Sequence, residues 1–447
     1  MNLKNKKVLV YGLGKSGIGA IKLLKKLKAK IFVYDDNIEV LNNFNDNLVT
    51  KIDCITENLL SNINLIVVNP CVSIYNEHLK LANILNKKII SEIELAYLFC
   101  KGKIIALTGS NGKTTTSTLT YNIFKENNCN CSLVGNVGTS FADVVSVNPK
   151  QTFVVEVSSF QLETINKFRA NTACFLNFSE NHLDRHFSLD NYFKTKCKIF
   201  KNSKHKDYKI LNYDDKTLQN IPKTKNTYYF SLNQMVKGTY VKEGYIYFYN
   251  GKTQEQIIDL SCIKLIGEHN IENVLCSVLI AKLNKIKTEV IERVVKNFYG
   301  INHRIEYSET INFVKFYNDS KSTTIKATQT ALNCFKEDRV LLILGGSNKE
   351  NDYNELFINL PSQVKQIIAI GEIREKILKI ASLYNFKNII AFDDFNMAIK
   401  NSYFLSLQNC CNVVLFSPAT ASYDMFKNFE ERGDCFKNIV KEIKSEN

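Results

Sequence analysis

One glycine-rich segment has residue types and a spacing that suit phosphate chemistry, Gly109-Ser-Asn-Gly-Lys-Thr-Thr115. Glycines let backbone N–H groups approach phosphate oxygens, Lys113 supplies a positive charge, and Thr114 supplies a hydroxyl for Mg²⁺. The spacing GxxGK[ST] is two residues shorter than the ordinary phosphate loop, so the match is either chance or a distinct ATPase subclass. The apolar run Ile104–Thr108 predicts a strand before it, and a helix is expected from near Thr114. This strand–loop–helix order favours an ATP-binding loop.

A polar segment, Glu156-Val-Ser-Ser-Phe-Gln-Leu162, directly follows the apolar run Phe153–Val155. A carboxylate at a strand end that faces a phosphate loop suits Mg²⁺, which makes Glu156 a metal candidate. Ser158 and Gln161 have side chains that hydrogen-bond to substrates. The alternative is that this serine-rich turn caps a helix.

A second polar segment, Asn177-Phe-Ser-Glu-Asn-His-Leu-Asp-Arg-His186, contains two of the six histidines in the chain. A single histidine is more often structural, but two in one polar motif favour a role in chemistry. His182 and Asp184 are hard to explain as core residues, so a second metal position is predicted here.

Another glycine-rich loop lies near the start of the chain, Gly12-Leu-Gly-Lys-Ser-Gly17. It follows the predicted strand Val8–Tyr11 and opens a helix, so its backbone is placed to approach a phosphate. Asp35 comes about 20 residues later, at the end of the next strand, where an acid holds a ribose or base. The alternative interpretation is a structural tight turn.

Length and composition limit the class of protein that positions these loops. The 447 residues indicate roughly three domains, at ~100–200 residues per domain. Hydrophobic residues at 45% and charged residues at 23% are ordinary for a soluble globular protein. The net charge of +14 comes from lysines scattered along the chain, so it is interpreted as compositional bias and no nucleic-acid partner is expected.

The location of the protein is predicted from what the chain lacks. No run reaches the ~20 apolar residues of a membrane span, and no signal peptide precedes the first strand, so we expect a cytoplasmic protein without a membrane partner. The 13 cysteines contain no paired CxxC motifs, which favours free, buried thiols in a reducing compartment over a zinc site.

Three successive series of apolar runs and amphipathic helices predict an α/β fold with doubly wound parallel sheets. The first contains a helix over Gly17–Leu27, the second begins at Lys103, and the third follows Arg304. A Tyr- and Thr-rich stretch, 226–259, predicts antiparallel hairpins late in the second domain. The predicted strands beyond those already given are Lys30–Tyr34, Leu65–Val68, Lys88–Ile90, Thr152–Val155, Cys174–Leu176, Val340–Leu344, Gln366–Ile370, Asn388–Ala391 and Val413–Phe416.

The polar motifs continue to the end of the chain. The later ones are Gly267-Glu-His-Asn-Ile-Glu-Asn273, His303-Arg-Ile-Glu306, Asn318-Asp-Ser-Lys-Ser-Thr323 and the segment Ser417-Pro-Ala-Thr-Ala-Ser-Tyr-Asp-Met-Phe-Lys-Asn-Phe-Glu-Glu-Arg-Gly433. Together with the earlier ones, and in the same order, they resemble the signature of the Mur ligase family over nearly the whole chain. The last two are similar to the branch of that family that adds D-glutamate.

The resemblance implies three domains. A Rossmann-like domain over 1–95 would bind the UDP substrate, a central P-loop ATPase-type domain over 96–298 would bind ATP, and a Rossmann-like domain over 299–447 would bind the amino acid. It also implies a monomer that uses ATP and two Mg²⁺ ions to phosphorylate the terminal carboxylate of UDP-N-acetylmuramoyl-L-alanine. The amine of D-glutamate would then attack the acyl phosphate, as a step of cytoplasmic peptidoglycan precursor synthesis. Such phosphoryl transfer needs charge neutralisation and positioning rather than a protein nucleophile.

Residue roles follow from the same resemblance. Catalytic roles fall on Lys113, His182, Lys196 and Lys321. ATP contacts fall on Gly109, Ser110, Asn111, Gly112, Lys113, Thr114, Thr115, Asn270, Asn273, Arg304 and Asp319. Contacts with the UDP substrate fall on Lys15, Ser16, Asp35, Asp36, Asn136, Ser158 and Gln161. Contacts with D-glutamate fall on Thr323, Lys349, Ser422 and Phe429. Metal contacts fall on Thr114, Glu156, His182 and, once carbamylated, Lys196.

Lys196 matches the carbamylated lysine of the family because it lies four residues after Tyr192, although Lys194 and Lys198 are rivals for that position. A carbamate turns a cation into an anion, which suits a ligand near Mg²⁺. Asn270 and Asn273 lie three residues apart, so a helix would place them on one face, implied to lie around adenine. Arg304 is implied on phosphate and Asp319 near the ribose, and a cationic Lys349 would select a substrate with an extra carboxylate.

Five positions depart from the family pattern, and none removes a residue that the chemistry requires. They are Cys71 for Gly, Asn181 for Asp, Thr324 for Asn, Glu350 for Gly and Thr420 for Cys. The alternatives are a family member that adds another amino acid or a dipeptide, a folate polyglutamate ligase, a nucleotide-binding scaffold without catalysis, and a nucleic-acid-binding protein.

Overall fold

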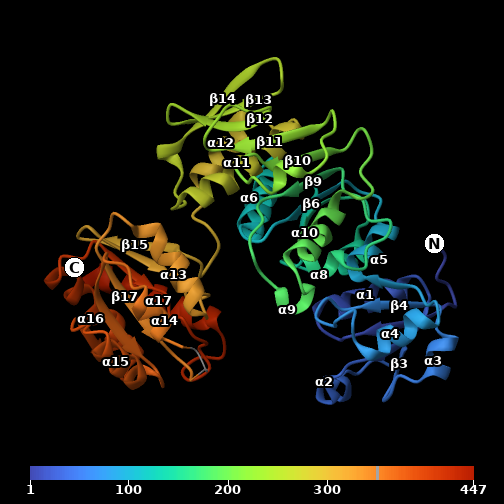
Figure 1. Ribbon diagram of the computed structural model, residues 1–447, viewed down its shortest axis with the longest axis horizontal. Helices are drawn as coiled ribbons and strands as arrows, with labels where there is room; N and C mark the ends of the chain where they lie inside the picture. The colour runs from blue at the N-terminus through green and yellow to red at the C-terminus, as the bar shows by residue number, and fades with distance from the viewer. Residues whose placement is uncertain (349–351, 447) are drawn as a thin grey trace. The chain divides into compact units, whose positions relative to one another are not determined.

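Alternating apolar runs and amphipathic helices build three sheets in the part of the chain that the computed structural model describes, residues 1–348 and 352–446 (Figure 1). These sheets belong to two compact units. The first unit comprises residues 1–263 and 269–297, and the second comprises residues 264–268 and the chain from 298 onward. The predicted α/β class is confirmed. The division into domains at 1–95, 96–298 and 299–447 stays a proposal.

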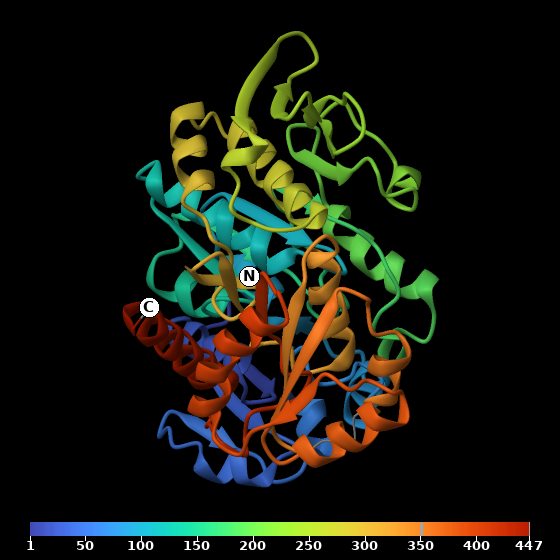
Figure 2. The same cartoon turned by 90° about the vertical axis from the view of Figure 1, so that its left-hand side faces the viewer.

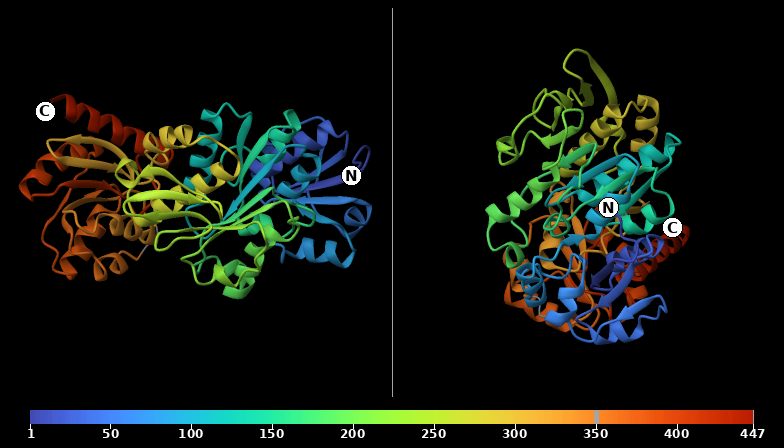
Figure 3. Two further views of the ribbon diagram at one scale, coloured as in Figure 1. Left: turned by 90° about the horizontal axis from the view of Figure 1, so that it is seen from above. Right: turned by 90° about the vertical axis from the view of Figure 1, so that its right-hand side faces the viewer.

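The N-terminal sheet is parallel, with the strand order β3-β2-β1-β4-β5. Val8 and Val10 of β1 pack with α1 and α5, whereas Leu9 and Tyr11 pack with α3 and α4, so helices cover both faces (Figure 3, left). Its elements are β1 (Lys7–Tyr11), α1 (Lys15–Lys26), β2 (Lys30–Tyr34), α2 (Ile38–Asn43), β3 (Val49–Lys51), α3 (Glu57–Asn62), β4 (Leu65–Val68), α4 (Glu77–Ile84), β5 (Ile89–Ser91) and α5 (Glu92–Phe99).

The central sheet has the order β14-β13-β12-β11-β10-β9-β6-β8-β7. Strand β6 lies between β8 and β9, parallel to both, so the residues that follow these three strands meet at one edge. Its strands are β6 (Ile104–Thr108), β7 (Cys131–Gly135), β8 (Thr152–Glu156), β9 (Thr172–Phe175), β10 (Tyr208–Asn212), β11 (Thr227–Ser231), β12 (Gly238–Lys242), β13 (Tyr245–Tyr249) and β14 (Gln254–Asp259). Its helices are α6 (Lys113–Glu126), α7 (Phe141–Val147), α8 (Ser159–Leu162), α9 (Leu183–His186), α10 (Leu189–Cys197), α11 (Glu268–Leu283) and α12 (Thr288–Lys296), with short 3₁₀ turns at Lys198–Phe200, Leu218–Asn220 and Leu260–Cys262.

The sheet of the second unit has the order β15-β16-β20-β17-β18-β19 and is parallel except for β15. Helices α13 to α15 cover one face, and α16 and α17 cover the other (Figure 2). Its elements are β15 (Glu306–Ile311), β16 (Val314–Asn318), α13 (Ile325–Leu332), a 3₁₀ turn (Asn333–Phe335), β17 (Val340–Gly345), α14 (Asn354–Ile358), β18 (Val364–Ile370), α15 (Arg374–Leu383), β19 (Ile389–Ala391), α16 (Phe395–Gln408), β20 (Val413–Phe416) and α17 (Phe429–Glu446).

The strands predicted from the sequence are confirmed, with ends that shift by up to two residues. The prediction of antiparallel hairpins over 226–259 is wrong in part. Strands β12, β13 and β14 do form hairpins, but β11 runs parallel to both β10 and β12. Alternation of apolar residues reveals a strand but not its direction, which depends on the route of the connection 232–237.

Buried carboxylates join the N-terminal and central sheets within the first unit. Glu92 accepts hydrogen bonds from Ser140 Oγ (2.7 Å) and from the backbone N of Ala142 at the start of α7. Glu94 accepts from the backbone N atoms of residues 166–168 at 2.7–3.0 Å. Burial raises the pKa of Glu92. Both oxygens of Glu94 accept hydrogen bonds, whereas the two donors of Glu92 reach Oε1 and leave the buried Oε2 without a partner. These contacts tie the two sheets together.

All thirteen cysteines have free thiols, as predicted. Only Cys174, Cys276 and Cys411 are buried, so the expectation of burial is wrong for the others. No helix within the described residues has the length and apolar character needed to cross a membrane.

Candidate functional site at the edge of the central sheet

The phosphate-loop residues form the turn between β6 and α6, as the motif predicts. Gly112 has a φ of +76°, and a Cβ there would lie 2.2 Å from Asn273 Oδ1, so this position requires glycine. Helix α6 begins at Lys113, and the first N–H groups of a helix lack partners within it. The loop therefore offers the backbone donors that a phosphate needs.

Residues 177–179, which follow β9, hold the phosphate loop from one side. The backbone N of Ser110 donates to Asn177 O (3.0 Å), and the backbone N of Asn111 donates to Asn177 Oδ1 (2.8 Å). Ser110 Oγ donates to Ser179 O and accepts from Ser179 N, both at 2.9 Å. The two segments singled out in the sequence are therefore parts of one site.

Asn270 and Asn273 share a face of α11, as predicted. Asn273 Nδ2 donates to Asn270 Oδ1 (3.0 Å), and Asn273 Oδ1 accepts from Thr116 Oγ1 of α6 (3.0 Å). Asn273 is buried, whereas Asn270 is partly exposed. Asn273 thus supports the phosphate loop from behind, and Asn270 is the more accessible member of the pair.

Two lysine side chains converge on one carbonyl oxygen of the loop. Lys196 Nζ donates to Gly109 O (2.7 Å), and Lys113 Nζ donates to the same oxygen (2.9 Å) and to Ser110 O (2.9 Å). Lys196 is 1% exposed and lies over the ring of Tyr192. Burial, and secondly the charge of Lys113, lower the pKa of Lys196 to about 6. The amine of Lys196 is thus held largely neutral near pH 7.

The two rival lysines lie elsewhere. Lys194 is an exposed residue that pairs with Asp190 on the same helix at 2.6 Å. Lys198 Nζ donates to Glu163 O (2.8 Å). Of the three lysines, Lys196 is the one that the structure places at the phosphate loop.

Glu156 is a buried carboxylate at the end of β8, beside the phosphate loop. It accepts from Asn136 Nδ2 (2.7 Å) and from Ser117 Oγ (3.3 Å), and Ser117 Oγ also donates to Thr114 O (3.2 Å). Within residues 1–348 and 352–446, no group of three or more His, Cys, Asp or Glu side chains is arranged to hold a metal. Mg²⁺ usually takes one or two protein ligands and completes its shell with phosphate and water. Glu156 and Thr114 fit an ion that arrives with a nucleotide.

His182 lies just before the short helix α9 with a left-handed backbone, φ +53°. Its ring lies edge-on to Phe160 at 4.9 Å and within 6.1 Å of the ring of Tyr192. Partial burial, and secondly Lys196, lower the pKa of His182, so its ring is kept neutral, the form that binds metals. Asn181, one of the departures, accepts from the backbone N of His182 (2.9 Å).

Ser158 and Gln161 form a capping box at the start of α8, which confirms the capping interpretation of this turn. Gln161 Oε1 accepts from the backbone N of Ser158 (3.0 Å), and Ser158 Oγ accepts from the backbone N of Gln161 (3.3 Å). The capping role does not exclude their predicted contacts with the UDP substrate, which stay a prediction, as do those of Asn136.

The acid predicted near the N-terminal glycine loop, Asp35, accepts a hydrogen bond from that loop, and its predicted contact with a ribose or base stays a prediction. Asp35 Oδ2 accepts from the backbone N of Leu13 (2.6 Å), and Asp36 accepts from the hydroxyl of Tyr11 (2.8 Å). Burial, and secondly Asp36, raise the pKa of Tyr11. Lys15 and Ser16 are two further residues predicted to contact the UDP substrate. They lie at the start of α1, where Lys15 is exposed and Ser16 is half-buried.

In the second unit, Asp319 is a buried acid next to the segment that carries Arg304, which is itself exposed. It accepts from the backbone N of Ile305 (3.1 Å) and from Ser417 Oγ (2.7 Å). Burial raises the pKa of Asp319 to about 6, opposed by its hydrogen bonds to Ser322 and Ser417.

Arg432 is the largest fully buried side chain, and it holds together the loops that carry the predicted D-glutamate residues. Its guanidinium donates to Ser320 Oγ and O (3.0 and 2.8 Å), to Thr420 O (3.0 Å) and to Ala421 O (3.0 Å). Burial lowers the pKa of Arg432 to about 10.

The predicted D-glutamate residues lie on and beside those loops. Lys321 follows Ser320 and lies with its Nζ 5.6 Å from the ring centre of Phe429, Ser422 is buried beside Ala421, and Thr323 is half-buried. Lys349 and the departure Glu350 lie outside the described residues. Two of the departures from the family pattern, Thr324 and Thr420, make hydrogen bonds within this unit. Thr324 caps α13, and Thr420 Oγ1 donates to Ser347 O (2.8 Å).

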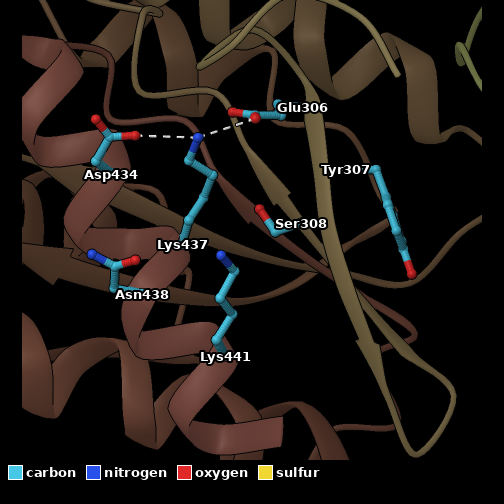
Figure 4. Close-up of a pocket in the computed structure, with 7 residues that line it drawn as sticks. All are labelled: Glu306, Tyr307, Ser308, Asp434, Lys437, Asn438 and Lys441. Carbon is cyan, nitrogen blue, oxygen red and sulfur yellow. Dashed lines mark hydrogen bonds and ion pairs between the residues drawn. The ribbon is translucent and has the colours of Figure 1, made fainter. Parts of the chain in front are cut away.

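Glu306 ends the motif His303–Glu306, but no role was predicted for it from the sequence. Its Oε2 accepts from the backbone N of His303 (2.8 Å) and from Asn318 Nδ2 (3.1 Å), the residues before Arg304 and Asp319. Lys437 bridges Glu306 and Asp434 at 3.2 Å each, in a surface pocket of about 510 Å³ (Figure 4). This pocket contains no predicted ligand contact, and its central charges neutralise one another.

The fold and the phosphate loop define an α/β nucleotide-dependent enzyme built from several sheets. Residues 107–281 match the Mur ligase middle domain, and residues 6–91 match the Mur ligase MurD-like N-terminal domain. The chain is 38% identical to the UDP-N-acetylmuramoylalanine--D-glutamate ligase of Thermoanaerobacter sp. (strain X514), over 99% of this chain and 100% of that protein. It is also 38% identical to the protein of that name from Caldicellulosiruptor bescii, over 99% of each. The chain belongs to the Mur ligase family and is an ATP-dependent ligase.

Two solved structures from Thermotoga maritima share the fold. One is UDP-N-acetylmuramate-alanine ligase, with a TM-score of 0.55 and 15% identity over 99% of this chain and 100% of that one. The other is a MurF ligase in complex with ADP, with a TM-score of 0.56 and 16% identity over 98% of this chain and 96% of that one.

Proposed function

We propose that this chain joins D-glutamate to UDP-N-acetylmuramoyl-L-alanine and converts ATP to ADP and phosphate, as a cytoplasmic monomer of three domains. The observation that carries the proposal is the full-length similarity to D-glutamate ligases. The motif 417–433, on which the choice of amino acid depends, lies within that similarity.

The phosphate loop binds ATP. The β- and γ-phosphates are bound by the backbone N–H groups of the loop together with Lys113 and Thr115. Mg²⁺ is held by Thr114 and Glu156. The ion, when bound, neutralises charge on the transferring phosphate. The hydrogen bonds from Asn136 and Ser117 to Glu156 support this role because they fix the carboxylate at the strand end.

Lys196 becomes a carbamate that, with His182, serves a second Mg²⁺. Burial, and secondly repulsion from the ammonium of Lys113 at the same carbonyl oxygen, favour the neutral amine at Lys196. A neutral amine adds to CO₂ and releases a proton, and the resulting carbamate is an anion beside the ammonium of Lys113. The reaction thus places an anion beside a cation, at a position where a second ammonium would be repelled.

The second unit binds the amino acid substrate. Thr323, Ser422, Phe429 and Lys349 bind D-glutamate, and Lys321 is a catalytic residue beside them. Arg432 supports this role because its four hydrogen bonds hold the two segments that carry these residues, at Ser320 and at Thr420–Ala421. Arg304 and Asp319 complete the ATP site.

Release of ADP with single amino acids tests the proposal. The purified chain receives Mg²⁺-ATP, UDP-N-acetylmuramoyl-L-alanine and one amino acid, and the coupled product is identified by mass. We expect ADP and an amide product with D-glutamate, and neither with L-glutamate, L-alanine or a diamino acid. Turnover with one of these but not with D-glutamate would overturn the assignment.

A further inference from the structure

Arg185 extends from the central sheet to a loop of the N-terminal sheet. Its guanidinium pairs with both carboxylate oxygens of Glu163, from Nε at 3.1 Å and from NH2 at 2.6 Å. The same group donates from NH2 to Val72 O (2.9 Å) and from NH1 to Cys71 O (3.3 Å). The side chains of the ion pair are only 10% and 4% exposed. A single arginine thus joins segments more than 110 residues apart in sequence.

The loop that Arg185 contacts lies against the N-terminal glycine loop. Asn69 accepts from the backbone N of Cys71 (3.0 Å), and a Cβ at Gly12 would lie 2.6 Å from Asn69 Cβ. A Cβ at Gly14 would likewise lie 2.9 Å from Asn69 Nδ2. The loop 69–72 therefore packs against the glycine loop that is proposed to hold the UDP substrate.

The other end of the connection is the proposed catalytic turn. Arg185 and His182 belong to the same turn around α9, and the ring of Phe160 contacts both, with the guanidinium 4.6 Å and the imidazole 4.9 Å from its centre. Phe187 has a φ of +64°, which is strained for a bulky residue, and its ring meets Tyr75 edge-on at 5.0 Å. The turn is thus held in an unfavourable backbone conformation against the loop.

We infer that Arg185 is a positioning residue that sets the UDP-substrate loop relative to the phosphate loop. The inference rests on the proposed function, in which the carboxylate of a substrate held by the N-terminal sheet must meet a phosphate held by the central sheet. A misplacement of about 1 Å costs ~10²-fold in such a reaction. A planar guanidinium serves four contacts in fixed directions, which a lysine cannot reproduce.

The variant Arg185→Lys tests this inference because it keeps a charge beside Glu163 but loses the two carbonyl contacts. Binding of UDP-N-acetylmuramoyl-L-alanine is measured by calorimetry, without turnover, and kcat and the KM values for this substrate and for ATP are measured beside it. We expect its affinity to fall ~10-fold or more, with the ATP KM within about twofold of the wild type. Glu163→Gln, which keeps the carbonyl donors in place, should have a smaller effect on the affinity.

Arg169→Lys is the matched control, because Arg169 forms the same two-bond pair with Asp207, at 2.6 and 2.5 Å, without reaching the loop. It should leave both KM values unchanged. An unchanged affinity for the UDP substrate together with an unchanged kcat in Arg185→Lys would overturn the inference, and so would equal losses in the three variants. The affinity and the KM values do not depend on the fraction of each variant that is folded. A wild-type chain that binds the UDP substrate but fails to use D-glutamate would overturn the proposed function alone.

Discussion

Two glycine-rich loops of the first unit occupy the same place in two different sheets, and the groups around them differ. Each follows a strand and opens a helix, at Gly12–Gly17 after β1 and at Gly109–Thr115 after β6. At the first loop, the Asp35 carboxylate occupies the N–H of Leu13. At the second, no carboxylate takes a loop N–H among the contacts described above, and Lys113 and Lys196 meet at Gly109 O.

This difference teaches that the loop alone does not decide the chemistry. Both loops offer backbone donors at a helix N-terminus. The carboxylate at the first loop takes up one of these donors, whereas the cations at the second favour the several phosphates of a nucleoside triphosphate. We therefore assign substrate holding to the first loop and phosphoryl transfer to the second.

The largest expected effect follows removal of the ammonium at the second loop. Lys113→Ala should lower kcat by ~10³-fold, about 4 kcal/mol of transition-state stabilisation, because developing charge on the γ-phosphate loses its cation. Calorimetry should show UDP-substrate binding unchanged. Near-normal turnover would remove the distinction between the loops.

Lys196→Ala should lower kcat by ~10²-fold, because a ligand that becomes anionic is lost near the phosphate. Added acetate or formate should restore part of the activity in this variant and none in Lys113→Ala. Lys194→Ala is the control, since Lys194 is exposed and pairs only with Asp190 in the contacts described. An equal loss in the control would show that the charge of the segment matters rather than one position.

Exchange of glycine for alanine should separate the two loops by substrate. Gly112→Ala should raise the KM for ATP by ~5–30-fold, because a positive φ and a contact with Asn273 add about 1–2 kcal/mol of strain. Gly12→Ala, with a φ of +94° and a contact with Asn69, should raise the KM for the UDP substrate instead. The same substrate affected in both variants would contradict the assignment.

The pKa of about 6 at Lys196 predicts a pH dependence for reactivation. Only the neutral amine adds to CO₂, so its available fraction rises as pH rises through about 6 and falls below it. Enzyme stripped of CO₂ and then incubated with bicarbonate should regain activity ~10-fold better at about pH 8 than at about pH 5, when both are assayed at one common pH. Equal recovery at both would argue against a carbamate.

The smallest effect is expected at the acid of the first loop. Asp35→Asn should raise the KM for the UDP substrate by ~3–10-fold, because a charge-assisted hydrogen bond to the backbone N of Leu13 becomes a neutral one. The KM for ATP should stay the same. Steady-state kinetics with each substrate varied in turn measures these two KM values separately.

The sequence predicted those parts of the site that depend on local order. Gly112, Lys113 and Glu156 lie in short motifs beside apolar strands, so their places followed from strand–loop–helix patterns. Ser158 and Gln161 stayed ambiguous because capping and substrate binding use the same residue types.

Other parts of the site depend on contacts between distant segments. Arg185 reaches residues more than 110 positions away, and Arg432 binds a loop 112 positions away. No local pattern reveals such partners, and the same limit explains the direction of β11. Their only signal was a basic residue inside a polar motif, in Asp184-Arg185-His186 and in Glu431-Arg432-Gly433.

The transfer of oxygen from the substrate carboxylate tests the central claim most directly. With both carboxylate oxygens of UDP-N-acetylmuramoyl-L-alanine labelled with oxygen-18, phosphorylation and attack by D-glutamate should leave a single labelled oxygen in the released phosphate, because the C–O bond breaks when the amide forms. Mass spectrometry of the phosphate detects it. Unlabelled phosphate, released together with the amide product, would contradict an acyl phosphate made at the second loop.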